Sequence, residues 1–574
     1  MESSNGAVGG RFRTRYAARM ERIEDRLRAL LRGALVAVGA DASAEIELEV
    51  PRVRAHGDFS TNVALRIAGE AGRPPREVAA GLLAGLPASP LLDRAEVAGP
   101  GFLNLFLTDA WLHEGLRAAL EERDDYGRLP RNGRSVQVEF VSANPTGPLH
   151  LGHARNAVIG DGIAAVLDAA GWRVEREYYF NDAGRQMELF GASVEARYLE
   201  RYGRPAELPE DGYRGDYVAD IAGEIAAAHG DTFLDLPPED RRARLLAEGA
   251  ERVLTMIRSS LERLGVVFDT YLSERTLHER GEVARAIALL RERGAAYDAE
   301  GAVFFRATDY GDDKDRVLVR SNGLPTYFAA DCGYLLDKFA RGFDRMIYVW
   351  GADHHGDVAR VKGAATALGL DAERLEMVLY QWVSLLRDGE VVGMSKRAGT
   401  LETLDGLLDE VGADATRFLL LSRSGDSPIE FDVELAKRRS MDNPVFYVQY
   451  AHARSASVLR LARERGLDPD ADATADLARL ASEPERDLLR SLVDLPERVR
   501  IAADLRAPHR LVHYAQELAA AFHRFYAECR VVGEEPEVAA ARLLLVRGAR
   551  QGIANVLRLI GVSAPEAMER LGED

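Results

Sequence analysis

Apolar and polar positions alternate in the two-residue period of a β-strand between residues 136 and 141. Beyond Gly152, apolar residues recur at helical spacing up to about residue 167, and Gly171 is placed to end that helix. Residues 144–148 contain two prolines, which disfavour both a helix and a continuing strand. The pattern therefore predicts a strand, a tight loop and a helix.

The alternation of strand and helix patterns continues through the middle of the chain. Residues 174–180 predict a second strand, and Asn181 with Asp182 is expected to cap the helix that follows. A continuous apolar run at 346–350 is typical of a strand buried on both faces, and 379–386 predicts a further strand. Strands that alternate with helices form a parallel sheet, so we expect a Rossmann-like nucleotide-binding domain. The sequence contains neither GxGxxG nor GxxxxGK[ST].

Stretches with different patterns predict three domains. Residues 1–115 combine an amphipathic helix at 11–38 with mixed strands and helices, so an α+β domain is expected. Residues 116–440 form the α/β domain, interrupted at about 190–300 by a charged helical stretch that we interpret as an insertion. Residues 441–574 show helical periodicity alone and predict an all-α bundle.

Composition narrows the class of protein. A chain of 574 residues is too long for one core, and 47% hydrophobic with 29% charged residues is typical of a globular protein. No apolar run approaches the ~20 residues of a membrane span, so no membrane partner is expected. Cys332 and Cys529 are too few for a disulfide framework, and a cytoplasmic location is predicted. The net charge of −18 gives no support to a nucleic-acid partner, although residues 431–574 are nearly neutral.

Candidate chemistry is concentrated where predicted strands end. His150, Gly152 and His153 lie at the loop–helix junction, where backbone N–H groups and the helix dipole attract phosphate. A bound nucleoside triphosphate suits these residues, and helix capping by the two histidines is the alternative. No thiol or carboxylate ligands stand nearby at zinc spacing, so no metal site is predicted. Asp353 and His354 follow the buried strand, where open α/β sheets bind ligands.

Several short segments, in this order, resemble the motifs of one enzyme family. EFVSANPTGPLHLGH at 139–153 ends in a segment similar to the HIGH motif of class I aminoacyl-tRNA synthetases. GMSKRAGT at 393–400 resembles the KMSKS loop of that class. Together with YFAAD at 327–331 and GADHHG at 351–356, these segments resemble the arginyl-tRNA synthetases of bacterial type. The resemblance covers nearly the whole chain.

The resemblance implies both the architecture and the site residues. The fold would be a Rossmann-like class I catalytic domain with an α+β N-terminal domain and an all-α C-terminal anticodon-binding bundle. The positions that match the ATP site are His150, Gly152, His153, Asp353, His354, Met394, Ser395 and Lys396. Of these, the catalytic positions would be His150, His153 and Lys396. The positions that match the arginine pocket are Glu139, Ser142, Asn144, Tyr327 and Asp331. The expected tRNA contacts are Phe102, Asn104, Tyr447, Tyr450 and Arg454.

Within the arginine pocket, we expect Tyr327 and Asp331 at the guanidinium, because a guanidinium needs fixed carboxylate and hydroxyl acceptors. The other three residues would surround the α-amino and carboxylate groups. In the KMSKS-like loop, Gly393 and Arg397 replace the first lysine and the last serine. This replacement leaves open whether Lys396 alone carries the charge.

The reaction that the resemblance implies is ATP-dependent attachment of L-arginine to its tRNA through an arginyl-adenylate. Mg2+ would accompany the ATP phosphates, the chain would be a monomer, and activation would need bound tRNA. The alternatives are another class I synthetase, a nucleotidyltransferase with the same HxGH chemistry, or a non-catalytic tRNA-binding paralogue. The two-cysteine count disfavours synthetases with zinc knobs, and the helical C-terminal stretch disfavours a nucleotidyltransferase. Intact His150, His153 and Lys396 disfavour the paralogue.

Overall fold

The structure is a computed structural model that describes residues 23–51, 53–392, 402–468 and 475–569. The chain forms two compact units. One unit contains the residues up to Arg123 together with Val458–Val493 and Arg524–Ala549. The other unit contains the remaining residues, including the whole α/β part of the chain. The helices of the C-terminal end contribute to both units.

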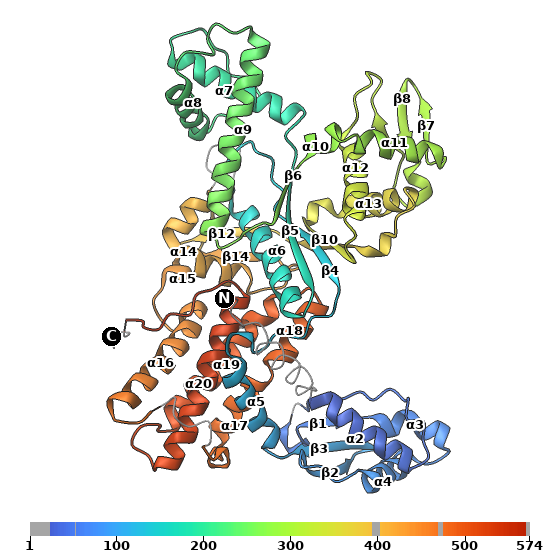
Figure 1. Cartoon of the computed structure of the whole chain (residues 1–574), viewed down its shortest axis with the longest axis vertical. Helices are drawn as coiled ribbons and strands as arrows, with labels where there is room; N and C mark the ends of the chain where they lie inside the picture. The colour runs from blue at the N-terminus through green and yellow to red at the C-terminus, as the bar shows by residue number, and fades with distance from the viewer. Residues whose placement is uncertain (1–22, 52, 393–401, 469–474, 570–574) are drawn as a thin grey trace, which may run out of the picture. The chain divides into compact units, whose positions relative to one another are not determined.

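A five-stranded sheet is the centre of the larger unit (Figure 1). Its strand order is β11-β10-β4-β5-β6, and every neighbouring pair is parallel. The strands are β4 (Ser135–Glu139), β5 (Arg173–Phe180), β6 (Thr270–Ser273), β10 (Arg345–Gly351) and β11 (Leu375–Tyr380). The strand order reverses at β4, which lies between β5 and β10. Ligands bind at such a switch point in open α/β sheets, beyond the carboxyl ends of the strands.

Helix α6 (Leu151–Ala169) follows β4 as the sequence pattern predicts. All five residues of β4 are buried, which requires cover on both faces of the strand. Gly160 allows α6 to approach the sheet closely, because an added Cβ would lie 2.2 Å from Cγ of Phe140. The predicted strand–loop–helix unit is therefore confirmed.

The stretch between β5 and β12 differs in part from the sequence prediction. Helices α7 (Arg185–Arg201), α8 (Asp216–His229) and α9 (Pro238–Arg263) form one helical group in Figure 1. The range 190–300 is not helical throughout, because β6 lies within it and pairs with β5. Periodicity does not indicate β6, because its sequence TYLS has no strict alternation of apolar and polar residues. The next elements are α10 (Glu274–Glu279), α11 (Glu282–Glu292), β7 (Ala296–Ala299), β8 (Ala302–Phe305), β9 (Arg316–Val319), α12 (Tyr327–Ala340) and α13 (His355–Ala367).

Two local predictions in this unit are wrong. Residues 379–386 do not form one strand, since β11 ends at Tyr380 and β12 (Val383–Arg387) belongs to another sheet. That sheet also contains β13 (Glu390–Val392) and β14 (Ile429–Asp432). Helix α14 (Leu404–Leu420) lies between these two strands in the sequence, and α15 (Val433–Lys437) follows β14. Asn181 and Asp182 do not cap α7, whose N-cap is Gly184. Their side chains instead accept hydrogen bonds from the backbone of Ala183 and from Ser273.

The predicted helical character of the C-terminal end is confirmed. The helices are α16 (Pro444–Glu464), α17 (Glu483–Val493), α18 (Leu495–Asp504), α19 (His509–Glu528) and α20 (Pro536–Leu559). Phe446 and Phe525 are buried, as expected of residues that pack in a core.

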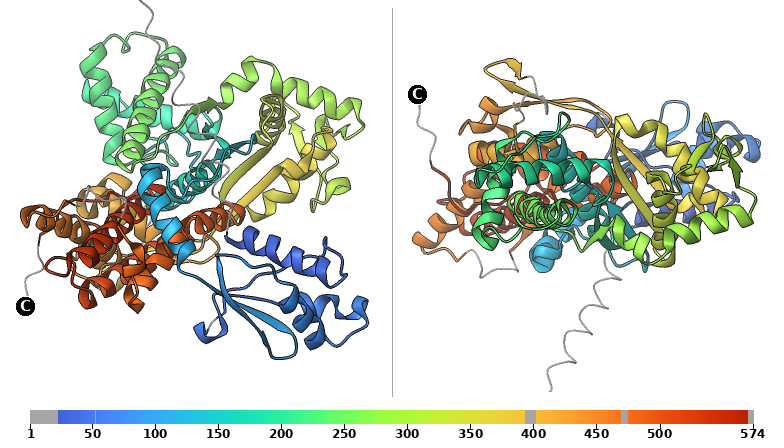
Figure 2. Two further views of the ribbon diagram at one scale, coloured as in Figure 1. Left: turned by 60° about the horizontal axis from the view of Figure 1, so that its bottom comes forward. Right: turned by 90° about the horizontal axis from the view of Figure 1, so that it is seen from above.

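The N-terminal part of the smaller unit is an α+β fold, as predicted. A three-stranded antiparallel sheet has the order β1-β3-β2. Helices lie beside this sheet in the blue part of Figure 2 (left). The elements are α2 (Ile23–Ala37), β1 (Phe59–Thr61), α3 (Val63–Ala71), α4 (Pro75–Gly85), β2 (Leu92–Ala98), β3 (Phe102–Leu107) and α5 (Ala110–Glu122). Leu27, Leu31 and Leu35 form the predicted apolar stripe of α2 and pack in one core with Val63 and Leu103.

Candidate active site

The backbone just after β4 adopts an unusual conformation. Val141 and Ser142 have φ angles of 65° and 44°, in the left-handed region that a β-branched residue rarely enters. Such strain persists only where the surrounding structure fixes it, and it is concentrated at functional sites. Here the side chain of Asn156 accepts a hydrogen bond from the Val141 N–H at 2.7 Å and donates to the carbonyl of Val349 at 3.0 Å. The turn is thus held by α6 and β10 together.

The two histidines of HLGH form a reciprocal cap at the start of α6. His150 is the N-cap, and its Nδ1 accepts the Gly152 N–H at 3.1 Å. Nδ1 of His153 in turn accepts the His150 N–H at 3.2 Å, and the two rings stack with centroids 3.7 Å apart. A neutral ring whose Nδ1 accepts a hydrogen bond carries its proton on Nε2. The histidines therefore cap the helix, as the alternative interpretation holds, and a phosphate site at this helix N-terminus stays a prediction.

The chain returns to this junction near the KMSKS-like segment. Thr403 forms a β-bridge with His150, and the Leu404 N–H donates to the carbonyl of Leu149 at 2.8 Å. Met394, Ser395 and Lys396 lie outside the described residues.

The predicted arginine pocket is assembled from β4, the loop after it and α12. Tyr327 is the first residue of α12, and Asp331 lies one turn later on the same face, as the spacing predicts. The hydroxyl of Ser142 donates to Oε1 of Glu139 at 3.2 Å. The Asn144 amide donates to Gln186 at 2.8 Å, which ties this loop to α7.

Gly184 lies directly against the hydroxyl of Tyr327 at the edge of the candidate pocket. Its φ is 82°, and an added Cβ would lie 2.5 Å from the hydroxyl oxygen of Tyr327. Tyr327 is 48% exposed, so its ring borders open space while its hydroxyl faces the loop that precedes α7. The sequence AGR at 183–185 therefore shapes the wall against which Tyr327 lies.

The acidic groups of the pocket fall into two classes. Glu139 is buried and its Oε2 accepts Lys338 Nζ at 2.6 Å, while Glu177 accepts Arg341. Asp331 and Glu274 form no ion pair with a lysine or arginine among the described residues. Burial raises the pKa of Asp331 to about 7, with help from the negative charges of Glu274 and Glu139. A buried acid with a raised pKa and no paired lysine or arginine can bind a cationic ligand.

Glu274 is a further candidate for the site, and the sequence did not indicate it. It is 5% exposed at the start of α10, directly after β6, and its Oε2 accepts the Tyr179 hydroxyl at 2.7 Å. Burial raises the pKa of its carboxyl to about 7. Among the described residues, the only basic side chain that pairs with Glu274 is His278, whose Nε2 lies 3.9 Å from Oε1. No motif marks Glu274, because it lies in the charged stretch interpreted as an insertion.

Asp353 and His354 lie at the carboxyl end of β10, in a short 3-10 turn at Ala352–His354. Both side chains are more than half exposed, and His354 Nδ1 lies 3.0 Å from Asp357. Since β10 is the neighbour of β4, these residues and the start of α6 flank the same switch point.

A buried arginine joins α6 by hydrogen bonds to the segment that follows β11 and to the segment that precedes β14. Arg155 is 0% exposed and donates to the carbonyls of Gln381 and Trp382, each at 2.6 Å. It also donates to Ser427 at 2.6 Å and to Ser424 at 3.3 Å. Burial lowers the pKa of Arg155 to about 10. These bonds hold the chain where β11 ends, which is why the predicted strand at 379–386 is divided.

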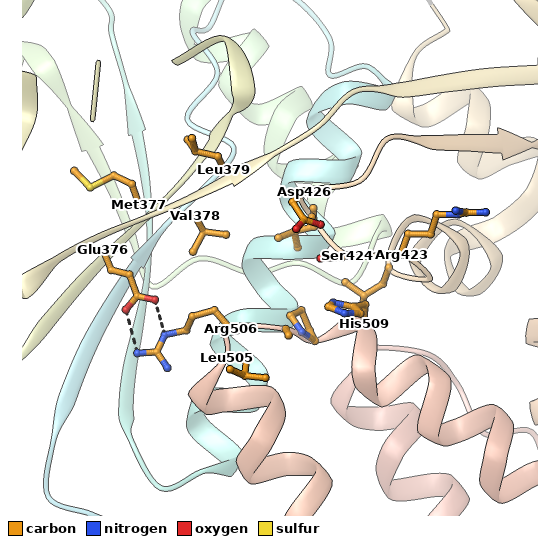
Figure 3. A pocket seen from close by; sticks show the side chains of 15 residues that line it. Glu376, Met377, Val378, Leu379, Arg423, Ser424, Asp426, Leu505, Arg506 and His509 are labelled. Atoms are coloured by element: carbon orange, nitrogen blue, oxygen red, sulfur yellow. Dashed lines mark hydrogen bonds and ion pairs between the residues drawn. The ribbon is translucent and has the colours of Figure 1, made fainter. Parts of the chain in front are cut away.

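A pocket of about 270 Å³ lies elsewhere in the larger unit (Figure 3). Its walls come from β11, the Leu421–Asp426 loop and the turn between α18 and α19, and Arg506 pairs with Glu376 on one side. None of the residues that the sequence identifies as site residues lines it.

The residues expected to contact tRNA differ in their surroundings. Tyr450 and Arg454 are neighbours on α16, where the Arg454 guanidinium lies 4.5 Å from the Tyr450 ring centroid. The Tyr447 ring meets His523 edge-on at 4.7 Å, so these aromatic and basic groups form one cluster. In the smaller unit, Phe102 begins β3, whereas Asn104 is 6% exposed and its amide oxygen accepts the Ser60 hydroxyl.

Comparison with known proteins decides the family. The family of class I tRNA synthetase (R) catalytic domains matches residues 115–425, the arginyl tRNA synthetase N-terminal domain matches 22–107, and the DALR anticodon binding domain matches 448–568. An arginine--tRNA ligase of Moorella thermoacetica is 50% identical over 92% of this chain and 95% of its own length. The chain belongs to the arginyl-tRNA synthetase family.

Solved arginyl-tRNA synthetase structures have the same fold. The one from Campylobacter jejuni is 35% identical, with a TM-score of 0.75, over 80% of this chain and 100% of that chain. The one from Thermus thermophilus is 25% identical, with a TM-score of 0.74, over 95% and 100%. The predicted family and fold class are confirmed, and the alternatives of another class I synthetase or a nucleotidyltransferase are not supported. No described helix is long and apolar enough to cross a membrane.

Proposed function

We propose that this chain attaches L-arginine to its tRNA in two steps that consume ATP. The observation that carries the proposal is the pair Asp331 and Glu274, two acids with raised pKa values and no lysine or arginine partner among the described residues. The guanidinium of arginine is a planar cation with several donors, and it satisfies two such carboxylates at once. Membership of the arginyl-tRNA synthetase family supports the same substrate.

The guanidinium lies between Asp331 and Glu274 in this proposal, with the hydroxyl of Tyr327 as a further acceptor. The α-ammonium group is held by Glu139, and Ser142 and Asn144 lie around the α-amino and carboxylate end. Ser142 supports this arrangement because its hydroxyl already contacts Glu139 at 3.2 Å. The strained turn at Val141 brings the polypeptide backbone towards that end of the substrate.

ATP is placed at the switch point of the sheet. Gly152 and the histidine cap of α6 receive the phosphates, Asp353 and His354 contact the ribose, and Mg2+ accompanies the phosphates. Met394, Ser395 and Lys396 act from the segment that precedes Thr403. The bridge between Thr403 and His150 supports this placement.

The reaction proceeds by two displacements. An arginine carboxylate oxygen attacks the α-phosphorus of ATP, the bond from that phosphorus to the bridging oxygen breaks, and pyrophosphate leaves. A terminal ribose hydroxyl of tRNA then attacks the arginyl carbonyl carbon and gives up its proton to water. The bond from that carbon to the phosphate oxygen breaks, and AMP leaves. His150, His153 and Lys396 stabilise charge that develops on the phosphates during the first step.

The three-domain division assigns the remaining contacts. Residues 1–115, with Phe102 and Asn104, would bind the outer corner of the tRNA. Residues 116–440 would be catalytic, and 441–574 would bind the anticodon through Tyr447, Tyr450 and Arg454. Aromatic rings and arginines in one cluster suit stacking and phosphate contacts. The chain acts as a monomer in this proposal.

The test is ATP–pyrophosphate exchange with each amino acid in turn, with and without arginine tRNA. Exchange that requires both arginine and tRNA supports the synthetase and its coupled activation. Exchange with arginine but without tRNA keeps the adenylate chemistry and removes the coupling. Folded protein that shows no exchange in either condition would instead be a non-catalytic tRNA-binding paralogue.

A further inference from the structure

Lys338 is a fully buried cation beneath the candidate arginine pocket. It lies on α12 with 0% of its side chain exposed, and its Nζ donates to Oε2 of Glu139 at 2.6 Å. The ammonium also lies over the rings of Tyr348 and Tyr334, 3.9 and 4.5 Å from their centroids. Burial of a lysine away from water is unfavourable unless the charge is paired and hydrogen-bonded. The ion pair with Glu139 and the contacts with the two rings therefore offset the unfavourable burial of this charge.

The spacing along α12 connects Lys338 with the pocket. Tyr327, Asp331, Tyr334 and Lys338 follow one another at intervals of four, three and four residues, so they share one face of the helix. The first two positions contribute to the proposed guanidinium site. The last two both contact Oε2 of Glu139, since the Tyr334 hydroxyl lies 2.9 Å from it.

The two oxygens of Glu139 therefore have different roles. Oε2 is occupied by Lys338 and Tyr334, which fix the carboxylate plane and balance its charge. Oε1 accepts only the Ser142 hydroxyl among the hydrogen bonds of the described residues, on the side of the strained turn. Oε1 is thus the oxygen that remains for the α-ammonium group of the substrate.

We infer that Lys338 is a positioning residue for the arginine pocket: by binding Oε2 it fixes the Glu139 carboxylate and turns Oε1 towards the α-ammonium group. This inference rests on the proposed function, in which Glu139 binds that group. Lys338 touches no substrate atom in this arrangement and acts through Glu139 alone.

The charges around Glu139 explain why the cation is needed. The other titratable groups that face this network are Glu177 and Tyr179 on β5, Glu274 on α10, Tyr348 on β10, Asp331 and Tyr334 on α12, and Arg341 at the C-cap of α12. Arg341 is hydrogen-bonded to Glu177, whose pKa stays low because Arg341 and Lys338 outweigh its burial. Without Lys338, the buried carboxylate of Glu139 would lie close to three other acids with no cation bound to it, and Oε2 would lose the bond that orients the carboxylate plane.

The test is the arginine KM of aminoacylation for the variants Lys338→Met, Lys338→Arg, Glu139→Gln and the double variant Glu139→Gln/Lys338→Met. Lys338→Met should raise the arginine KM about 10- to 100-fold at neutral pH, the range expected for a lost charge-assisted hydrogen bond. The ATP KM should stay unchanged. Lys338→Arg should retain most of the affinity.

Arg542→Met is the matched control, because it deprives another buried acid, Glu485, of its arginine in the smaller unit. It should lower stability and leave the arginine KM unchanged. An unchanged arginine KM in Lys338→Met would overturn the inference. An equal rise of the arginine and ATP KM values would also overturn it, because it would indicate a general structural effect.

The double variant keeps the inference testable if Lys338→Met does not fold, because two neutral side chains leave no unpaired buried charge. The double variant should have the same arginine KM as Glu139→Gln. A further rise of more than about 5-fold, a difference that exceeds simple additivity error, would show that Lys338 acts through another group and would refute the inference. An unchanged arginine KM in Glu139→Gln itself would instead refute the proposed role of Glu139.

Discussion

Replacement of Glu274 by glutamine separates the role of this residue in binding from its effect on stability. Glutamine has nearly the same shape and can still accept the Tyr179 hydroxyl, which lies 2.7 Å from Oε2 of the glutamate. The substitution removes one negative charge from the proposed guanidinium site. The variant should therefore bind arginine less well. Without arginine at neutral pH, its free energy of unfolding should be larger than that of the wild type.

The magnitude follows from the pKa of the buried carboxyl. Burial raises the pKa of Glu274 from 4.5 to about 7, and each unit corresponds to about 1.4 kcal/mol, so ionisation in the folded protein costs about 3 kcal/mol. The folded state holds this proton more tightly than the unfolded state. Stability is therefore lost as pH rises from about 4.5 through about 7, and the loss is complete above that range.

The assay compares the thermal unfolding of wild type and Glu274→Gln without arginine at about pH 5, 7 and 8.5. The difference in stability should be small at the lowest pH and should grow to at most about 3 kcal/mol in favour of the variant at the highest. Addition of arginine should stabilise the wild type at high pH and the variant much less. Aminoacylation should show an arginine KM raised about 10-fold or more, with little change in the ATP KM.

Two results would contradict this reasoning. A variant that is less stable than wild type by the same amount at every pH would show that Glu274 is a structural residue with an ordinary acidity. An unchanged arginine KM would show that the guanidinium does not contact Glu274, and the proposed pocket would then rest on Asp331 alone.

Further predictions concern the frame of the site and its chemistry. Gly184→Ala should raise the arginine KM and lower stability by about 1 kcal/mol, because φ is 82° and the new Cβ would displace Tyr327; steady-state kinetics and urea unfolding measure the two effects. Arg155→Met removes a donor from four backbone carbonyls, of which those of Trp382 and Ser424 keep a backbone N–H, so urea unfolding should show a loss of about 3 kcal/mol. His153→Ala and Lys396→Ala should each lower kcat by about 100-fold with little change in arginine KM, which pyrophosphate exchange can measure. A large rise in arginine KM for either variant would place that residue in the amino-acid pocket instead.

The sequence predicts those parts of the site that depend only on residues close to one another in the chain. The strand, loop and helix around HLGH follow from periodicity and two prolines, and the shared face of Tyr327 and Asp331 follows from a spacing of four residues. Both features are properties of one short segment. The parallel character of the sheet follows from the alternation of strands and helices.

Glu274 and Lys338 could not be predicted in this way. Glu274 reaches the pocket only because β6, a strand of four residues, joins the edge of the parallel sheet next to β5. Lys338 reads as an ordinary surface lysine near the end of an amphipathic helix, yet it is fully buried. The role of each depends on pairing between segments that are distant in the sequence, and periodicity carries no information about such pairing.

The distribution of charge explains how such a site can distinguish arginine from a neutral analogue. Arg341 and Lys338 balance Glu177 and Glu139, so these two acids do not depend on the substrate for a counterion. Asp331 and Glu274 have no such balance among the described residues, and ionisation of both is unfavourable until a cation arrives. A side chain of the same shape with a carbonyl in place of one guanidinium nitrogen would face two acids without neutralising either. Selectivity of this kind arises from leaving buried polar groups unpaired, which discriminates more strongly than shape alone.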